Sequence, residues 1–122
     1  MNIVMCGDPD WEDYHSVYVI ISGSKLVAQS LEEELVIYHR GYRGLDTVVE
    51  TTARLLGVQT VDVHPDKRHG VQANSKRNQA MIDDYKPQAV YGFKLGLKST
   101  ASDDIVRRAR EAGVPTYTVT HE

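Results

Sequence analysis

Apolar residues along the chain form five short runs, separated by longer stretches with a different spacing. The runs are four to six residues long and contain many β-branched side chains. They cover Ile3–Cys6, Glu34–Tyr38, Val58–Val63, Gln88–Phe93 and Thr116–Val119. Near-continuous apolar runs of this length are typical of parallel strands that are covered by helices on both faces. We therefore expect five parallel strands.

Between the runs, apolar positions recur every three or four residues, which is the spacing of a helix with one buried face. One such stretch ends at Gly57 and another at Gly113, and a glycine is the common stop signal after a helix. The two stripes are Leu45, Val48, Val49, Thr52, Leu55 and Leu56, and Ala101, Ile105, Ala109 and Ala112. A third helix is predicted over Asn74–Tyr85, before Pro87.

The segment Trp11–Leu31 fits two structures. Its apolar positions suit a helix, but Val17–Ile21 is also rich in strand-forming residues and Gly23 weakens a helix interior. We predict a helix, because neighbouring parallel strands need a crossover connection. The alternation of strands and helices then predicts a single doubly wound α/β domain over residues 1–122.

Composition and charge narrow the class of protein. The chain has a net charge of -3, whereas general nucleic-acid and anionic-membrane binders rely on excess Lys and Arg. The single cysteine, Cys6, allows no intrachain disulfide. No signal peptide is recognisable, and no apolar stretch approaches the roughly 20 residues that span a bilayer. We expect a cytoplasmic protein, with neither a membrane nor nucleic acid as its partner.

Basic residues are concentrated in the loops that should follow the strands. Eight of the fourteen Lys and Arg residues lie there, namely Arg40, Arg43, Lys67, Arg68, Lys76, Arg77, Lys94 and Lys98. Solvated loops gather charge in any protein, which is the simpler explanation. However, ligands of doubly wound proteins bind at the carboxyl ends of the strands. The pattern therefore suggests an anionic ligand such as a nucleotide.

The loop from Gly96 to Thr100 points most directly to that ligand class. It joins the fourth predicted strand to a helix with acidic residues first and basic residues last. Free backbone N–H groups at a helix N-terminus stabilise a phosphate or carboxylate. Asp103 has a second interpretation, because Thr100-Ala-Ser-Asp103 also matches a capping box.

Arg77 is the most informative single residue. It shares a helix face with Ala80 and Met81, which should pack on the sheet. A partly desolvated guanidinium there needs an anionic partner. That partner is either a ligand or one of the carboxylates of Asp84, Asp46 and Asp8.

Other candidate chemistry is weaker. His39, His64 and His69 lack the spacing of a metal site, so we expect no metal, and no cofactor is implied. Cys6 lies in a predicted buried strand and should be inert. Trp11, Tyr14 and Tyr42 either stack on a base or pack in a core or interface.

Four segments, in order, resemble motifs of the YspA-like branch of the SLOG superfamily, which includes DprA and the Lonely Guy phosphoribohydrolases. Gly7-Asp-Pro-Asp-Trp11 resembles Gly-x-Arg-Asp-Trp/Phe, and His39-Arg-Gly-Tyr-Arg-Gly-Leu-Asp46 resembles His-Gly-Gly-Ala-Arg-Gly-Ala-Asp. Asn74-Ser-Lys-Arg-Asn-Gln-Ala-Met81 resembles Gly-Pro-x-Arg-Asn-x-x-Met, and Gly96-Leu-Lys-Ser-Thr100 resembles Gly-Gly-x-Gly-Thr. The resemblance covers nearly the whole chain.

The resemblance implies a Rossmann-like domain that binds a nucleotide or an ADP-ribose-like ligand as a sensor or sequestering protein. Relatives of this kind occur in bacteria and phages and often self-associate. The implied ligand-binding residues are Gly7, Asp8, Gly41, Arg43, Gly44, Asp46, Arg77, Asn78, Gly96, Ser99 and Thr100. The alternative is a phosphoribohydrolase that cleaves a nucleotide N-glycosidic bond, with Arg77 and Asp103 as catalytic residues. Ser99 replaces a glycine and Asp103 a glutamate of the family pattern, which favours binding over catalysis.

Overall fold

The computed structural model describes residues 1–41 and 43–121. Its centre is a five-stranded parallel sheet with the strand order β3-β2-β1-β4-β5. The strands are β1 (Asn2–Gly7), β2 (Val36–His39), β3 (Gln59–Asp62), β4 (Ala89–Leu95) and β5 (Thr116–His121). The helices are α1 (Tyr14–Ser30), α2 (Leu45–Leu56), α3 (Ala73–Asp83) and α4 (Asp103–Glu111), and a 3-10 helix, η1 (Lys67–Gln72), precedes α3. The predicted doubly wound α/β fold is confirmed.

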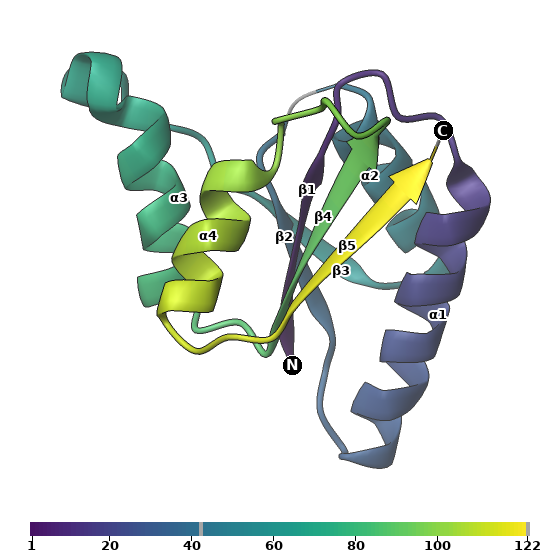
Figure 1. Ribbon diagram of the computed structural model, residues 1–122. Helices are drawn as coiled ribbons and strands as arrows, with labels where there is room; N and C mark the ends of the chain where they lie inside the picture. Colours follow the sequence, from purple (N-terminus) through teal and green to yellow (C-terminus); the bar gives the residue numbers. More distant parts are fainter. Residues whose placement is uncertain (42, 122) are drawn as a thin grey trace.

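The helices form two layers, one on each face of the sheet. Figure 1 shows α1 and α2 on one face and α3 and α4 on the other. The chain builds β1, β2 and β3 outward in one direction and then returns to place β4 beside β1. The loops that leave β1 and β4 therefore diverge to opposite faces. This reversal is the position at which open α/β sheets commonly bind ligands.

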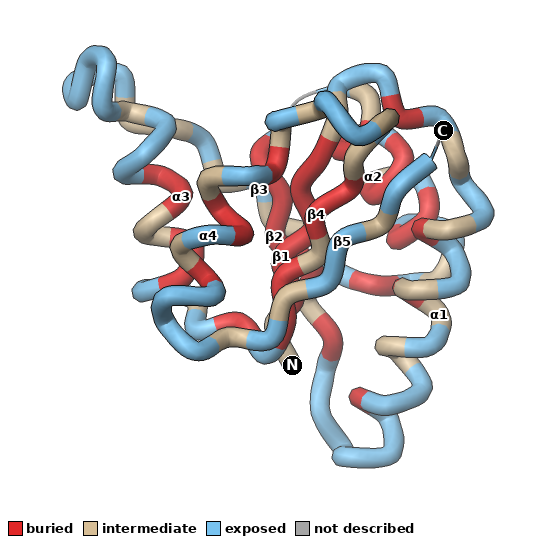
Figure 2. The backbone as a smooth tube through the Cα atoms, in the orientation of Figure 1, coloured by how far each residue is buried: buried red, intermediate tan, exposed pale blue. Residues whose placement is uncertain are grey.

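The alternation of side chains along β1 separates the two cores. Ile3 and Met5 pack in the layer under α1 and α2, whereas Val4 and Cys6 pack in the layer under α3 and α4. Successive residues of a strand point to opposite faces, so both layers are apolar only if the strand is apolar throughout. The central strands are accordingly the most buried part of the chain (Figure 2).

The segment Tyr14–Ser30 is a helix, so the alternative strand at 17–21 is wrong. The helix begins three residues later than Trp11, because the Asp13 carboxylate accepts hydrogen bonds from the backbone N–H groups of His15 and Ser16 and caps it. Trp11 itself is buried in the core and donates its indole N–H to the Asp13 carbonyl. No helix in the described residues is long and apolar enough to cross a bilayer.

Two further differences from the predicted elements lie in the segments that follow β3 and β4. Helix α4 starts at Asp103 with Ser102 as its N-cap, and the Ser102 side chain makes no capping hydrogen bond. The Asp103 N–H instead binds the Thr100 carbonyl, so the expected capping box does not form. The 3-10 helix η1 was not predicted, because its residues show no periodic spacing of apolar side chains. It projects with the start of α3 beyond the sheet (Figure 1).

Candidate ligand site at the carboxyl edge of the sheet

Asp8 joins three loops at the point where the sheet reverses direction. Its backbone N–H donates to the Phe93 carbonyl of β4 at 3.0 Å, and its carbonyl accepts from the Leu45 N–H at the start of α2 at 3.2 Å. Its carboxylate Oδ2 accepts the Ser99 hydroxyl at 2.8 Å. Two predicted ligand residues from opposite ends of the sequence are thus in direct contact.

Arg40 connects the same loops from the end of β2. Its guanidinium donates from Nη2 to the Gly7 carbonyl at 3.0 Å and from Nη1 to the Ala101 carbonyl at 2.8 Å. The side chain is buried. The sequence placed Arg40 among the basic loop residues but not among the site residues. The sequence feature that could have identified Arg40 is its position directly after the apolar strand β2.

Gly44 is required by the packing of the chain itself. Its φ is +75°, and a Cβ atom there would lie 2.0 Å from the Pro9 carbonyl oxygen. The glycine therefore lets two loops touch, which is a structural role apart from any ligand. The neighbouring Arg43 is exposed at the same turn. Gly41 donates its backbone N–H to Nδ1 of His39.

Arg77 and Asn78 are both buried side chains of α3. The Arg77 Nε donates to Asn78 Oδ1 at 2.8 Å, and its Nη1 lies 3.5 Å from the Val63 carbonyl. Asn78 in turn donates to Asp104 Oδ2 at 2.9 Å. The two adjacent predicted site residues thereby take part in a network that ties the helices of one layer together.

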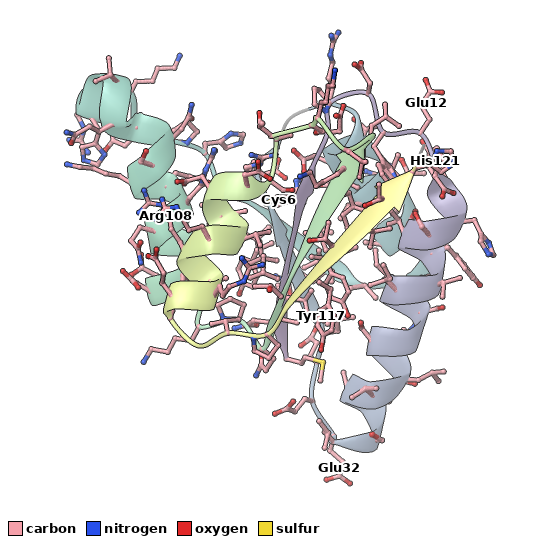
Figure 3. The ribbon with its side chains drawn as sticks, in the orientation of Figure 1. Cys6, Glu12, Glu32, Arg108, Tyr117 and His121 are labelled. Atoms are coloured by element: carbon pink, nitrogen blue, oxygen red, sulfur yellow. The ribbon has the colours of Figure 1, made fainter. Side chains whose placement is uncertain are left out.

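Asp104 is the anionic centre of this network. It accepts hydrogen bonds from Arg108 Nε at 2.8 Å and from Arg107 Nη2 at 2.8 Å. Figure 3 shows Arg108 on α4 on the side that faces α3. Burial alone would raise the pKa of the Asp104 carboxyl. Hydrogen bonds from Arg108, Asn78 and Arg107 outweigh it and lower the pKa to about 2.

The loop before α4 is the predicted anion site, and several of its polar groups have partners within the protein. Gly96 has φ +75° and donates its N–H to the His121 carbonyl of β5 at 2.8 Å. Ser99 is held by Asp8, and Thr100 is exposed. At the start of α4, Asp103 is paired with Lys94 at 3.3 Å. The two predicted catalytic residues therefore have different surroundings. Arg77 contacts the Val63 carbonyl after β3, whereas Asp103 pairs with Lys94 of β4.

A buried histidine, His39, contacts two carboxylates at the carboxyl ends of β2 and β3. The Nε2 atom of His39 lies 2.9 Å from Glu50 Oε1 and 2.8 Å from Asp62 Oδ1. Asp46, also buried, has Oδ1 3.9 Å from His39 Nδ1. Burial would raise the pKa of the Glu50 carboxyl, but hydrogen bonds from His39 and Thr60 lower it on balance. Spacing along the sequence does not reveal this cluster, because its members come from three elements.

Cys6 lies between the sheet and α4 (Figure 3) and is completely buried. Burial raises the pKa of its thiol to about 12, with smaller opposing effects from the nearby Arg40 and Arg77 guanidiniums. The thiol is therefore unreactive, as its place in a buried strand predicted.

The aromatic candidates divide between core and surface. Trp11 packs edge-on against Phe93, with ring centroids 5.2 Å apart, so it is a core residue. Tyr14 is 47% exposed beside a cavity of about 190 Å³. Tyr42 lies outside the described residues. A cavity of about 370 Å³ is lined by Glu12 and His121, which Figure 3 places together at the end of β5. Neither cavity is lined by Ser99 or Arg77.

Comparison with protein-family models, with curated proteins and with solved structures gave no match. The strand order and the two helical layers define the class of the protein as a Rossmann-like α/β domain.

Proposed function

We propose that this domain binds a nucleotide or a nucleotide-derived, ADP-ribose-like molecule at the carboxyl edge of the sheet, between the loops that follow β1 and β4. The observation that carries the proposal is the Asp8–Ser99 hydrogen bond at the reversal of strand order. It brings a carboxylate and a hydroxyl together where ligands of this fold class are held. These two groups suit ribose hydroxyls and phosphate oxygens respectively.

The charge around this contact supports an anionic ligand. Arg43 and Lys98 are exposed on the loops at this edge. Cationic side chains and a helix N-terminus both stabilise phosphate, and α4 begins at Asp103, three residues after Thr100. In this proposal the ligand phosphate takes over the Ser99 hydroxyl, while Asp8 binds a ribose hydroxyl. Gly96 shapes the loop.

The ordered motifs add the proposal that the chain is a SLOG protein of the YspA-like branch. In that case it acts as a cytoplasmic sensor or sequestering protein, and self-association is the expected state. The enzymatic alternative has less support, because Arg77 is held in the α3–α4 network and Asp103 is paired with Lys94. Release of free base from nucleoside monophosphates, abolished in Asp103→Asn, would favour the hydrolase.

The direct test is a thermal-shift titration of the full chain with nucleoside monophosphates, nucleoside diphosphates and ADP-ribose. A bound ligand at about 100 times its Kd should raise the Tm by roughly 5–10 °C. Lys98→Glu and Ser99→Ala should weaken the binding by about tenfold each. Lys67→Glu makes the same charge change on η1, away from the sheet, and serves as the control. If no member of the panel shifts the Tm, the proposal is wrong.

A further inference from the structure

We propose that His39, Glu50 and Asp62 form a binding site for a divalent transition-metal ion such as Zn²⁺. One ligand atom from each side chain lies within 4.8 Å of the other two. An imidazole with two carboxylates is a donor set that suits zinc and related transition metals better than Mg²⁺ or Ca²⁺, which prefer oxygen ligands alone.

The fold itself assembles the three residues. His39 and Asp62 end neighbouring parallel strands and are direct register partners between β2 and β3. Glu50 comes from α2, the helix that connects these two strands. A crossover helix packs back over the strands it joins, so its inward polar residue reaches the strand ends. The site is thus a property of one β-α-β unit.

The two carboxylates of Glu50 and Asp62 both lie against a single ring nitrogen of His39, Nε2. The backbone N–H of Gly41 donates to Nδ1 at 3.1 Å, so Nδ1 holds a lone pair and the ring proton lies on Nε2. That single N–H faces both Glu50 Oε1 and Asp62 Oδ1. Two carboxylates beside one imidazole gather acidic groups at a single point, where a divalent cation would bind all three.

Asp46 completes the arrangement that metal-binding histidines commonly have. Its buried Oδ1 lies 3.9 Å from His39 Nδ1, on the side of the ring opposite the two carboxylates. When Nε2 binds a metal, the ring proton moves to Nδ1 and is then directed at Asp46. A carboxylate behind a ligating histidine fixes the tautomer and raises its basicity. The exposed Gly41 N–H then donates to water.

The side chains of Glu50 and Asp62 can move apart far enough to admit a metal ion. In a tetrahedral site with bonds of about 2.0 Å, ligand atoms lie about 3.3 Å apart, wider than the present hydrogen bonds. His39 is buried and fixed, whereas the Glu50 and Asp62 side chains are 35% and 43% exposed and can move outward. The exposed His64, whose Nε2 is 3.8 Å from Asp62 Oδ2, is available as a fourth ligand in place of water.

This inference does not depend on the proposed nucleotide site. The metal ligands lie at the ends of β2 and β3, while the nucleotide loops follow β1 and β4. It also replaces the expectation of no metal, which rested on the spacing of histidines along the sequence. Binding of metal alone tests it, without any nucleotide.

The experiment is calorimetric titration of the chelator-treated full chain with Zn²⁺ alone. We expect one equivalent to bind with a Kd of about 10 µM or tighter. Glu50→Gln and Asp62→Asn keep the side-chain shapes and should each weaken binding by about tenfold or more. Asp83→Asn and Glu111→Gln, exposed acids on α3 and α4, should bind like the wild type. Circular dichroism and Tm verify that every variant is folded.

Cobalt provides a second measurement that identifies the ligands. Co²⁺ should give visible absorption bands in the wild type that lose intensity in Glu50→Gln and Asp62→Asn. His64→Ala should keep the stoichiometry, whether or not His64 takes the fourth position. The inference is overturned if the wild type binds no Zn²⁺ at about 100 µM. It is equally overturned if Glu50→Gln and Asp62→Asn bind as the wild type does, since surface histidines would then account for the binding.

Discussion

The Ser99 hydroxyl donates a 2.8 Å hydrogen bond to the Asp8 carboxylate and so links the loops after β1 and β4. The two residues are 91 positions apart in the chain. The loops lead to helices on opposite faces of the sheet, and this bond holds them together at the carboxyl edge. In the proposed function, a ligand replaces this polar contact.

Removal of this contact should cost little stability. Ser99→Ala should lower the free energy of unfolding by about 1 kcal/mol, the typical net value of a part-buried hydrogen bond. Urea unfolding monitored by circular dichroism measures it. Ser30→Ala, which removes a hydroxyl bonded within α1, is the matched control and should change stability by less than about 0.5 kcal/mol. A Ser99→Ala loss of more than about 3 kcal/mol would show that the loop is a folding element rather than a site.

Gly44→Ala should be severely destabilising. The new Cβ would lie 2.0 Å from the Pro9 carbonyl oxygen, and neither backbone segment can give way cheaply. We expect a loss of at least about 3 kcal/mol, or failure to fold. Gly57→Ala is the comparison, because Gly57 has φ +68° but open space around it. Its loss should be only about 1–2 kcal/mol. Similar unfolding midpoints for the two variants would contradict this account of Gly44.

The Asp104 network should make stability depend on acid pH. The folded-state pKa of Asp104 is about 2, below its ordinary value of 3.8, so the ionised carboxylate favours the folded state. Its contribution is present above about pH 4 and is lost as the pH falls toward 2. Asp104→Asn should therefore show a flatter fall of Tm over this range than the wild type.

Arg108→Gln should flatten the same pH dependence, because Arg108 is the first of the hydrogen-bond donors that lower the Asp104 pKa. Arg110→Gln removes an exposed positive charge from the same helix and should leave the slope as in the wild type. Equal slopes in Arg108→Gln and Arg110→Gln would mean that total charge, rather than this network, sets the acid sensitivity.

The Cys6 thiol should be inaccessible to reagents in the folded protein. Burial raises its pKa to about 12, so almost no thiolate is present at about pH 8. A chromogenic disulfide reagent should label less than about a tenth of the protein under native conditions and all of it in denaturant. Fast native labelling would show that the layer under α3 and α4 opens readily.

The sequence predicted helices and strands well where a buried face gives the apolar residues a regular spacing. Apolar runs marked all five strands, and the stripe from Leu45 to Leu56 gave both ends of α2, although Leu55 of that stripe is 78% exposed. The segment from Tyr14 required an argument about connectivity, because its composition suits either structure. Capping decided the ends: Asp13 starts α1 later than expected, and the predicted cap at Thr100 is replaced by Ser102.

Contacts between loops were much less predictable. Periodicity reports which face of an element is buried, but it carries no information on which loop residues meet across the sheet. The motifs brought attention to Asp8 and Ser99 separately, and Arg40 was passed over although it bonds to both of their loops. Likewise, the sequence analysis did not single out Glu50, which contacts His39 only because α2 packs beside β2.

The sequence by itself determined a doubly wound α/β domain, because burial on both faces of the sheet leaves near-continuous apolar runs in the central strands. It also indicated the edge where polar chemistry gathers, since loops after parallel strands share one edge. Only the tertiary structure decided the long-range pairings: Asp8 with Ser99, Asn78 with Asp104, and His39 with Glu50 and Asp62. Each pairing depends on strand order and register, which long-range packing sets and local patterns do not encode.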